Sequence, residues 1–269
     1  MRPCGGSGTD GPDPARPPAP IHPTSRDLSI IGAFVITVDN LSKTFTLHIL
    51  NEKKIAACRD ISFSVPQSGF LGLSGPSGAG KSTVLKCLYR TYLSTSGAIR
   101  YNSAAHGRVD LATLPDRAVI DIRDREMGYV SQFLKVIPRV SALDVVMEPI
   151  LARNGVSRDA ARKRAIGLLD RLRIPSHLFD AYPATFSGGE QQRINIARAV
   201  SWKPRLLLLD EPTASLDKDS VGVVLEILKE LREEGTTMIG IFHDTTLLAS
   251  VTDSVYHINN FVHPEFVTG

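Results

Sequence analysis

A glycine-rich loop between a predicted strand and a predicted helix constrains this chain more than any other feature. The loop fits the pattern G-x-x-x-x-G-K-[ST], and its residues are Gly75, Pro76, Ser77, Gly78, Ala79, Gly80, Lys81, Ser82 and Thr83. Glycines let the backbone turn tightly, so that successive N–H groups point at one anion. An apolar run precedes the loop and a helical pattern follows it, and the helix N-terminus adds positive potential. The loop therefore predicts a phosphate site, in which Lys81 reaches the β- and γ-phosphates of a nucleotide and Ser82 ligates Mg²⁺.

The composition is that of an ordinary folded protein. Hydrophobic residues make up 42% of the chain and the net charge is only +3, which gives no support for nucleic-acid binding. Three scattered cysteines are typical of reduced thiols in the cytoplasm, and the dispersed histidines predict no metal cluster. No apolar stretch approaches the ~20 residues that span a bilayer, and the N-terminus lacks the apolar core of a signal peptide. We therefore expect a cytoplasmic protein without a direct membrane span.

The order of strand and helix patterns predicts an α/β fold with a mostly parallel sheet. Strand patterns occur at residues 33–38, 56–65, 70–73, 96–101, 127–132, 206–209 and 237–242, and helix patterns at 83–89, 142–178, 191–201 and 221–233. Ser141 is the expected N-cap of the first helix of the long helical tract. We expect one domain over residues 32–258, with a helical subdomain at about 133–185 and a C-terminal extension over 259–269. The Pro- and Gly-rich residues 1–31 are expected to be disordered, as a regulatory tail or as a variable extension.

A second nucleotide-binding pattern ends the strand over residues 206–209. Four consecutive leucines predict a fully buried central strand, and Asp210 and Glu211 follow it directly. Ligands of open α/β sheets bind at the carboxyl ends of the strands. We therefore expect Asp210 to hold Mg²⁺ and Glu211 to orient or deprotonate a water molecule that attacks the γ-phosphate.

A Ser-Gly-Gly turn predicts a second anion site. Ser187, Gly188, Gly189 and Glu190 lead into the helix expected near Gln191, so that a hydroxyl, bare amides and a helix N-terminus come together. One domain does not need two γ-phosphate cradles for one ATP. The second cradle therefore predicts a homodimer, in which each copy completes the ATP site of the other.

Together these residues resemble the ATP-binding cassette (ABC) ATPases over residues 33–258. The matching features are the Walker A loop at residues 75–83, the Q-loop at Gln132, the signature at 187–190, Walker B at 206–211, the D-loop at 215–217 and the switch histidine at His243. The resemblance implies a P-loop NTPase fold with an antiparallel β subdomain and an inserted α-helical subdomain. It also implies that Gln132 contacts Mg²⁺ and water, that His243 bonds to the γ-phosphate, and that Phe45 stacks on adenine. Phe45 is equally explained as a plain strand aromatic.

The signature departs from the common L-S-G-G-Q at two positions. Phe186 and Glu190 replace leucine and glutamine, but Ser187 and both glycines are kept. The departures therefore leave the predicted phosphate contacts in place.

Several longer stretches resemble one lineage of this superfamily. Residues 41–48, 128–143, 185–198 and 240–244 are similar to the PhnL family, the ABC-type subunit of the bacterial carbon–phosphorus lyase system. The resemblance implies phosphonate catabolism. In that family the subunit acts with other Phn subunits in forming alpha-D-ribose 1-methylphosphonate 5-triphosphate. The sequence leaves open which phosphonates are used. It also leaves open whether ATP is a substrate or only drives a conformational change.

Two alternatives remain at this point. The first is an ATPase subunit of a transporter of the lipoprotein-release or macrolide-export type, which is similar around Gln132. The second concerns the role of residues 133–139, which combine apolar side chains with two cations; the apolar residues are Phe133, Leu134, Val136 and Ile137, and the cations are Lys135 and Arg139. Such a patch is typical of a docking surface, here for soluble lyase subunits, but its apolar residues could also pack internally against the helix that contains Val145.

Overall fold

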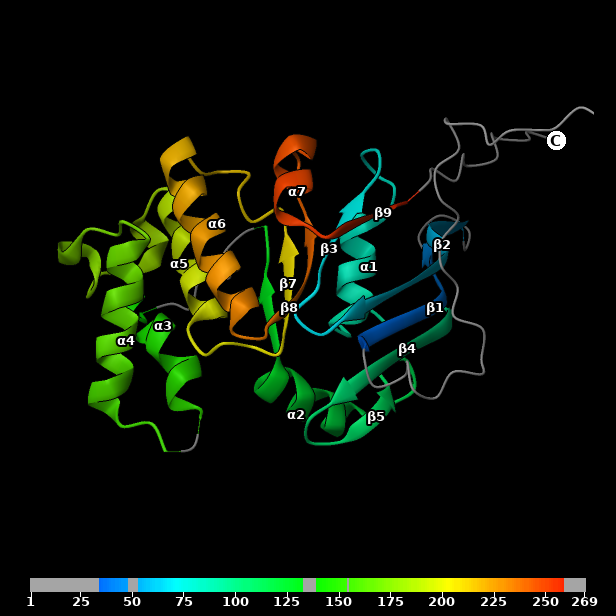
Figure 1. Ribbon diagram of the computed structural model, residues 1–269, viewed down its shortest axis with the longest axis horizontal. Helices are drawn as coiled ribbons and strands as arrows, with labels where there is room; N and C mark the ends of the chain where they lie inside the picture. The colour runs from blue at the N-terminus through cyan, green and yellow to red at the C-terminus, as the bar shows by residue number, and fades with distance from the viewer. Residues whose placement is uncertain (1–33, 48–52, 133–138, 154, 259–269) are drawn as a thin grey trace, which may run out of the picture. The chain divides into compact units, whose positions relative to one another are not determined.

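The computed structural model describes residues 34–47, 53–132, 139–153 and 155–258 (Figure 1). The predicted tail over residues 1–31, the predicted extension over 259–269, and residues 133–138 of the predicted docking segment lie outside the described residues. Within the described part of the chain, no helix is long and apolar enough to cross a membrane.

A parallel sheet forms the centre of the domain. Its strands lie in the order β6 (Met127–Val130), β7 (Leu206–Asp210), β8 (Thr237–Ile241), β3 (Phe70–Ser74) and β9 (Ser254–His257). The leucines of β7 alternate between two hydrophobic clusters, because successive side chains of a strand point to opposite faces. The predicted fully buried strand is therefore confirmed.

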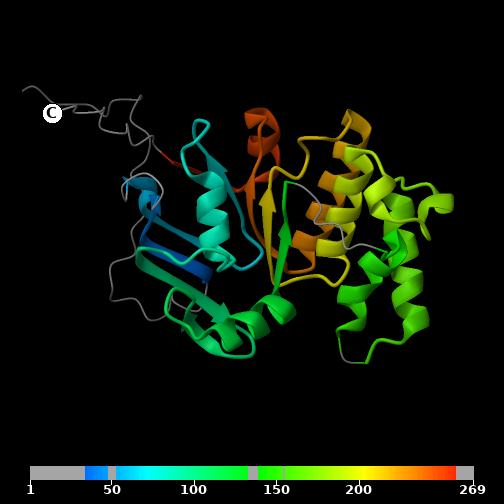
Figure 2. The same ribbon diagram turned by 180° about the vertical axis from the view of Figure 1, so that it is seen from behind.

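An antiparallel sheet packs beside the parallel one. Its order is β2 (Lys53–Pro66), β1 (Phe34–Leu47), β4 (Ser96–Ser103) and β5 (Gly107–Asp110). Helix α1 (Lys81–Leu88) contacts β2 as well as β7 and β8, so it lies between the two sheets, as Figure 2 shows from behind. One hydrophobic cluster joins α1 to both sheets, and it includes Val84, Leu85 and Leu88.

The helices that follow β6 in the sequence pack against the other face of the parallel sheet and extend beyond it. They are α3 (Ala142–Leu151), α4 (Arg158–Arg171), α5 (Gly188–Val200), α6 (Lys218–Glu233) and α7 (Thr245–Val251), with short 3₁₀ turns at Ser176–Leu178 and Pro183–Thr185. Helix α3 packs against α4 and α5, and α2 (Asp116–Glu126) packs beside β6. The predicted α/β fold, with its parallel core, antiparallel sheet and helices, is confirmed.

Several element boundaries differ from the sequence-based expectations for local reasons. Ser141 caps α3 as predicted, since its hydroxyl accepts a bond from the Asp144 amide at 3.1 Å. Helix α5 begins at Gly188 instead of near Gln191, because Ser187 caps it, and α6 begins at Lys218 because Asp217 caps it. Such caps satisfy the free amides of the first turn and allow the helix to start earlier.

The inner face of α4 also differs by one residue from the expected spacing. The sequence places Ala161, Ala165, Leu168 and Leu172 at helical spacing, and all of these are buried except Leu168, which is only partly buried while its neighbour Leu169 is fully buried. The position four residues after Ala165 lies more closely on the buried side of this helix than the position three residues after it.

Candidate functional site

The glycine-rich loop connects the end of β3 to the start of α1, in a backbone conformation that requires glycine. Gly80 has φ of 90°, and a Cβ placed on it would come within 1.9 Å of the Ala57 carbonyl oxygen. Gly75 has φ of 144°, and its Cβ would meet the Ile258 carbonyl oxygen at 2.5 Å. Any side chain at these positions would displace backbone, so only glycine allows the tight turn that is predicted to point successive loop amides at a phosphate.

Lys81 lies folded over this loop. Its ammonium group donates to the carbonyl oxygens of Gly75 at 2.7 Å and Pro76 at 2.9 Å. Both bonds lie within the turn that is predicted to hold the phosphates. The ammonium group is therefore positioned at the loop that carries the predicted γ-phosphate contacts.

The predicted metal ligands meet although they are far apart in the sequence. The Ser82 hydroxyl donates to Asp210 Oδ1 at 2.8 Å, and Asp210 is 5% exposed. A hydroxyl and a carboxylate that are adjacent to a phosphate loop form a donor set that suits Mg²⁺, which prefers oxygen ligands. The residues present therefore fit the predicted ion.

Tyr129 also reaches this carboxylate, and we did not predict its role from the sequence. Its phenol donates to Asp210 Oδ2 at 3.0 Å. The residue lies on β6, in register with Leu208 of β7. The contact depends on which strand pairs with β7, and the sequence of either strand alone carries no signal for it.

The predicted catalytic residues gather at the carboxyl ends of β6, β7 and β8. The Glu211 amide donates to the Ile241 carbonyl oxygen at 3.1 Å, and His243 follows Ile241 by two residues. The side-chain nitrogen of Gln132, Nε2, lies 3.4 Å from Glu211 Oε2. Glu211 has φ of 52°, a left-handed conformation that is uncommon for residues other than glycine. The structure thus brings Gln132 beside Glu211 and places His243 after the adjacent strand, while their catalytic roles stay predictions.

Two buried amides on α5 hold the backbone near these residues, and we assigned them no role from the sequence. Gln192 donates to the Ser131 carbonyl oxygen at 3.3 Å and to the Pro212 carbonyl oxygen at 3.2 Å. Asn195 donates to the Ser131 carbonyl oxygen at 2.7 Å. Polar residues three positions apart on an otherwise apolar helix face are the signal that could have identified them, since buried polar groups are normally hydrogen-bonded.

The second predicted anion cradle lies at the N-terminus of α5. Helix α5 packs in the cluster with Leu207 and Leu209, whereas α1 packs in the cluster with Leu206 and Leu208. The two helices therefore lie on opposite faces of β7. This separation supports the prediction that the cradle serves a nucleotide bound to a second copy.

Glu190 engages the serine that is predicted to bind phosphate. The Ser187 hydroxyl donates to Glu190 Oε2 at 2.8 Å, and the Ser187 amide donates to the same oxygen at 2.9 Å. These bonds hold the pKa of the Glu190 carboxyl below its usual range, with the Ser187 hydroxyl bond as the largest cause. The carboxylate and an incoming γ-phosphate would therefore compete for one donor, and both are anions.

Glu190→Gln is expected to favour ATP-dependent dimerisation. The amide keeps an oxygen for the Ser187 N–H but removes the charge, and a change of about 1 kcal/mol for one exposed charge corresponds to about fivefold. The ATP concentration for half-maximal dimer, measured by light scattering, should therefore fall about fivefold. Glu190→Ala is the control, since it removes the charge and also the oxygen that accepts the bond from the Ser187 amide. An unchanged or higher ATP requirement in Glu190→Gln would contradict the competition.

Phe45 lies on β1 near the end of α1. Its ring meets Tyr92 edge-on with centroids 5.2 Å apart, and the Lys43 ammonium lies 4.8 Å from the ring centroid. Stacking of this ring on adenine stays a prediction.

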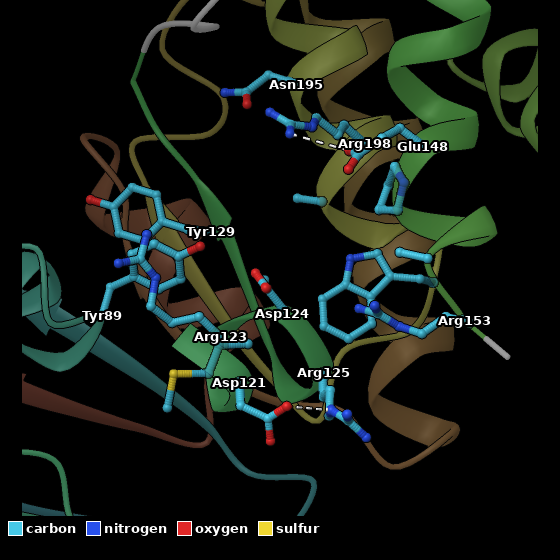
Figure 3. Close-up of a pocket in the computed structure, with 16 residues that line it drawn as sticks. Tyr89, Asp121, Arg123, Asp124, Arg125, Tyr129, Glu148, Arg153, Asn195 and Arg198 are labelled. Atoms are coloured by element: carbon cyan, nitrogen blue, oxygen red, sulfur yellow. Dashed lines mark hydrogen bonds and ion pairs between the residues drawn. The ribbon is translucent and has the colours of Figure 1, made fainter. Parts of the chain in front are cut away.

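A groove of about 530 Å³ lies between α2, β6 and the helices α3 and α5 (Figure 3). On one wall the Arg123 guanidinium lies 4.1 Å from the centroid of the Tyr89 ring. On the opposite wall the Arg153 guanidinium lies 3.8 Å from the centroid of the Trp202 ring. Tyr129 also lines the groove, so the groove adjoins the predicted metal site.

Comparison with known proteins identifies related sequences over most of the chain. A family model described as ABC transporter matches residues 58–214. The L-cystine import ATP-binding protein TcyC of Bacillus subtilis is 34% identical, over 85% of this chain and 88% of the relative. The arginine transport ATP-binding protein ArtP of Escherichia coli is 36% identical, over 75% of this chain and 81% of the relative.

One further relative is much longer than this chain. The macrolide export ATP-binding/permease protein MacB of Syntrophobacter fumaroxidans is 36% identical over 86% of this chain, which corresponds to 31% of MacB.

Solved structures agree with the fold. The dimeric structure of MJ0796, a bacterial ABC transporter cassette, has a TM-score of 0.74 and 30% identity, and it covers 83% of this chain and 94% of that one. A second dimeric structure of MJ0796, in a post-hydrolysis state bound to ADP and Pi, has a TM-score of 0.75 and 29% identity. The predicted cassette fold is therefore confirmed.

Proposed function

The chain belongs to the ABC transporter family as an ATP-binding ATPase subunit, and on that premise we propose that it hydrolyses ATP for the bacterial carbon–phosphorus lyase system. The sequence observation that carries this proposal is the likeness of residues 128–143, 185–198 and 240–244 to the PhnL family. The protein would act in the cytoplasm with Phn subunits, in forming alpha-D-ribose 1-methylphosphonate 5-triphosphate.

The chemistry proposed for the site follows from where its residues lie. The loop amides and Lys81 bind the phosphates of ATP, and Ser82, Asp210 and Gln132 would hold Mg²⁺. An ion held by these residues would supply positive charge that offsets the charge of the phosphates. Glu211 accepts a proton from the attacking water, while Gln132 and His243 orient that water and the γ-phosphate.

The same proposal includes a homodimer with two composite ATP sites. Each copy would offer residues 187–190 to the nucleotide held by residues 75–83 of the other. The support is the position of the two cradles on opposite faces of β7, together with the dimeric state given for MJ0796.

We further propose the division into a tail over residues 1–31, a cassette over 32–258 with a helical subdomain at about 133–185, and an extension over 259–269.

We place the partner of this subunit at the groove beside Gln132. The groove presents aromatic rings under arginine guanidinium groups, and it is lined by Tyr129, three residues before Gln132. Tryptophan, tyrosine and arginine dominate the binding energy of protein interfaces. A partner docked there would respond to the nucleotide through Gln132 and the helices that follow it.

A second candidate function is favoured by the named relatives. TcyC and ArtP are named for amino-acid transport, and MacB for macrolide export. An ATPase subunit of a transporter would use the same groove for a membrane partner. Co-purification from phosphate-starved cells separates the two functions: recovery with Phn subunits supports the lyase role, and recovery with an integral membrane permease alone replaces it with transport.

Trp202→Ala is expected to reduce the recovery of that partner at least tenfold. Truncating a central interface aromatic typically costs 2 kcal/mol or more. Tyr182→Ala is the matched control, because Tyr182 is 49% exposed and does not line the groove. Both variants should bind ATP like the unchanged protein. Equal partner recovery with both variants would exclude the groove as the docking site.

A further inference from the structure

Tyr129 lies with one end at the predicted metal site and its ring at the groove. Its phenol donates to Asp210 Oδ2 at 3.0 Å, while the Ser82 hydroxyl donates to Oδ1 at 2.8 Å. Each carboxylate oxygen therefore has its own donor. With both oxygens bonded, the plane of the carboxylate is fixed, although Asp210 is the last residue of its strand.

The ring of Tyr129 belongs to a stack that lines the groove. Its centroid lies 4.9 Å from that of Tyr89, and the rings are inclined by 40°. The Arg123 guanidinium lies over Tyr89 at 4.1 Å. Figure 3 shows these three side chains together on one side of the groove. Arg123 lies on α2, Tyr89 directly follows the last residue of α1, and Tyr129 lies on β6. The stack therefore joins three separate parts of the fold.

We propose that Tyr129 is a positioning residue, which holds the Asp210 carboxylate in its metal-binding orientation and connects it to the groove through the Tyr89–Arg123 stack. This inference rests on the proposed function of Asp210 as a ligand of Mg²⁺. Partners that hydrogen-bond a metal-binding carboxylate fix its orientation, and removing them typically lowers metal affinity by 10–100-fold. An occupant of the groove that moves Arg123 or Tyr89 would also move the ring that carries this donor.

Tyr129→Phe isolates the hydroxyl, because it keeps the ring and its packing. We expect the Mg²⁺ concentration for half-maximal binding of a fluorescent, non-hydrolysable ATP analogue to rise about tenfold. Binding of the same analogue in EDTA should be unchanged, since the phenol contacts the carboxylate and not the phosphate loop. Tyr89→Phe is the matched control: it removes a hydroxyl from the same aromatic pair and leaves the bond to Asp210 in place.

The outcomes separate this inference from the proposed function. If the unchanged protein binds the analogue without any Mg²⁺ dependence, the assignment of Asp210 fails and the inference fails with it. If the unchanged protein requires Mg²⁺ and Tyr129→Phe has the same requirement, only the inference fails. A lower melting temperature with an unchanged Mg²⁺ requirement would assign the hydroxyl a purely structural role and would also overturn the inference.

A double-mutant cycle tests the connection to the groove. Arg123→Ala should raise the Mg²⁺ requirement in the unchanged background, by less than Tyr129→Phe does, because it loosens the stack but leaves the phenol bond. In the Tyr129→Phe background the same substitution should have no further effect, since residues that act through one contact are not additive. Equal effects in both backgrounds would show that Arg123 does not act through Tyr129.

Discussion

Glu211→Gln is expected to lower the rate of ATP hydrolysis by about 10²–10⁴-fold, which is the usual loss when one general base is removed. Glu211 is placed for this role by the hydrogen bond from its backbone N–H to the Ile241 carbonyl oxygen, by the Gln132 side-chain nitrogen at 3.4 Å from its carboxylate, and by a left-handed φ of 52°. Glutamine has nearly the same shape and keeps an oxygen that can orient water, but it cannot accept the proton. Nucleotide binding should therefore persist, and the dimer should accumulate in the presence of ATP.

Two measurements check this prediction. Phosphate release gives the hydrolysis rate, and light scattering or size-exclusion chromatography with ATP gives the fraction of dimer. Glu233→Gln is a suitable control, because it makes the same change at an exposed residue, the last of α6. Normal hydrolysis by Glu211→Gln would show that another group activates the water.

The phosphate loop and the central strand could be predicted from sequence because their constraints are local. Gly75 and Gly80 are required by backbone that leaves no room for a Cβ, and the pattern around them fixes the positions of Lys81 and Ser82. Four leucines in a row similarly predict a strand that is buried on both faces, and all four are fully buried. Each of these features needs only a few consecutive residues.

Helix α2 was not predicted because its sequence is mostly charged. Only Val119 and Ile122 place apolar side chains toward the interior, and Glu126 at its end is buried. That carboxylate accepts bonds from the Tyr101 hydroxyl at 2.9 Å and the Ser103 hydroxyl at 2.6 Å. A helix that is held by a buried polar network lacks the strong hydrophobic periodicity from which a helix is usually predicted.

The site details that escaped sequence reasoning depend on pairings between distant elements. Tyr129 meets Asp210 only because β6 pairs with β7, and Gln192 reaches the Ser131 carbonyl oxygen only because α5 packs beside β6. The bond between Ser187 and Glu190 is different. A serine followed by glutamate three residues later is a known helix-start pattern, so this contact was readable from the sequence.

The strongest test of the composite site mixes two variants that are each inactive. Lys81→Ala is expected to abolish ATP binding, because it removes the cation that lies over the phosphate loop and that we propose to contact the phosphates. Ser187→Arg is expected to leave ATP binding by the monomer intact and to block dimerisation, since a bulky cation replaces the hydroxyl at the α5 cradle. Each substitution damages a different half of the site.

In a mixed dimer of these variants, one site carries both substitutions and the other carries neither. Random pairing in a two-fold dimer therefore predicts recovery of at most about a quarter of the unchanged activity, from a mixture in which neither component hydrolyses ATP alone. Placing both substitutions on one chain gives the control, measured on mixed dimers isolated through a different affinity tag on each chain, because the mixed dimer with the unchanged chain contains no intact site. Confirmed mixed dimers without any recovered ATPase activity would show that the cradle at Ser187 does not complete the ATP site of a second copy.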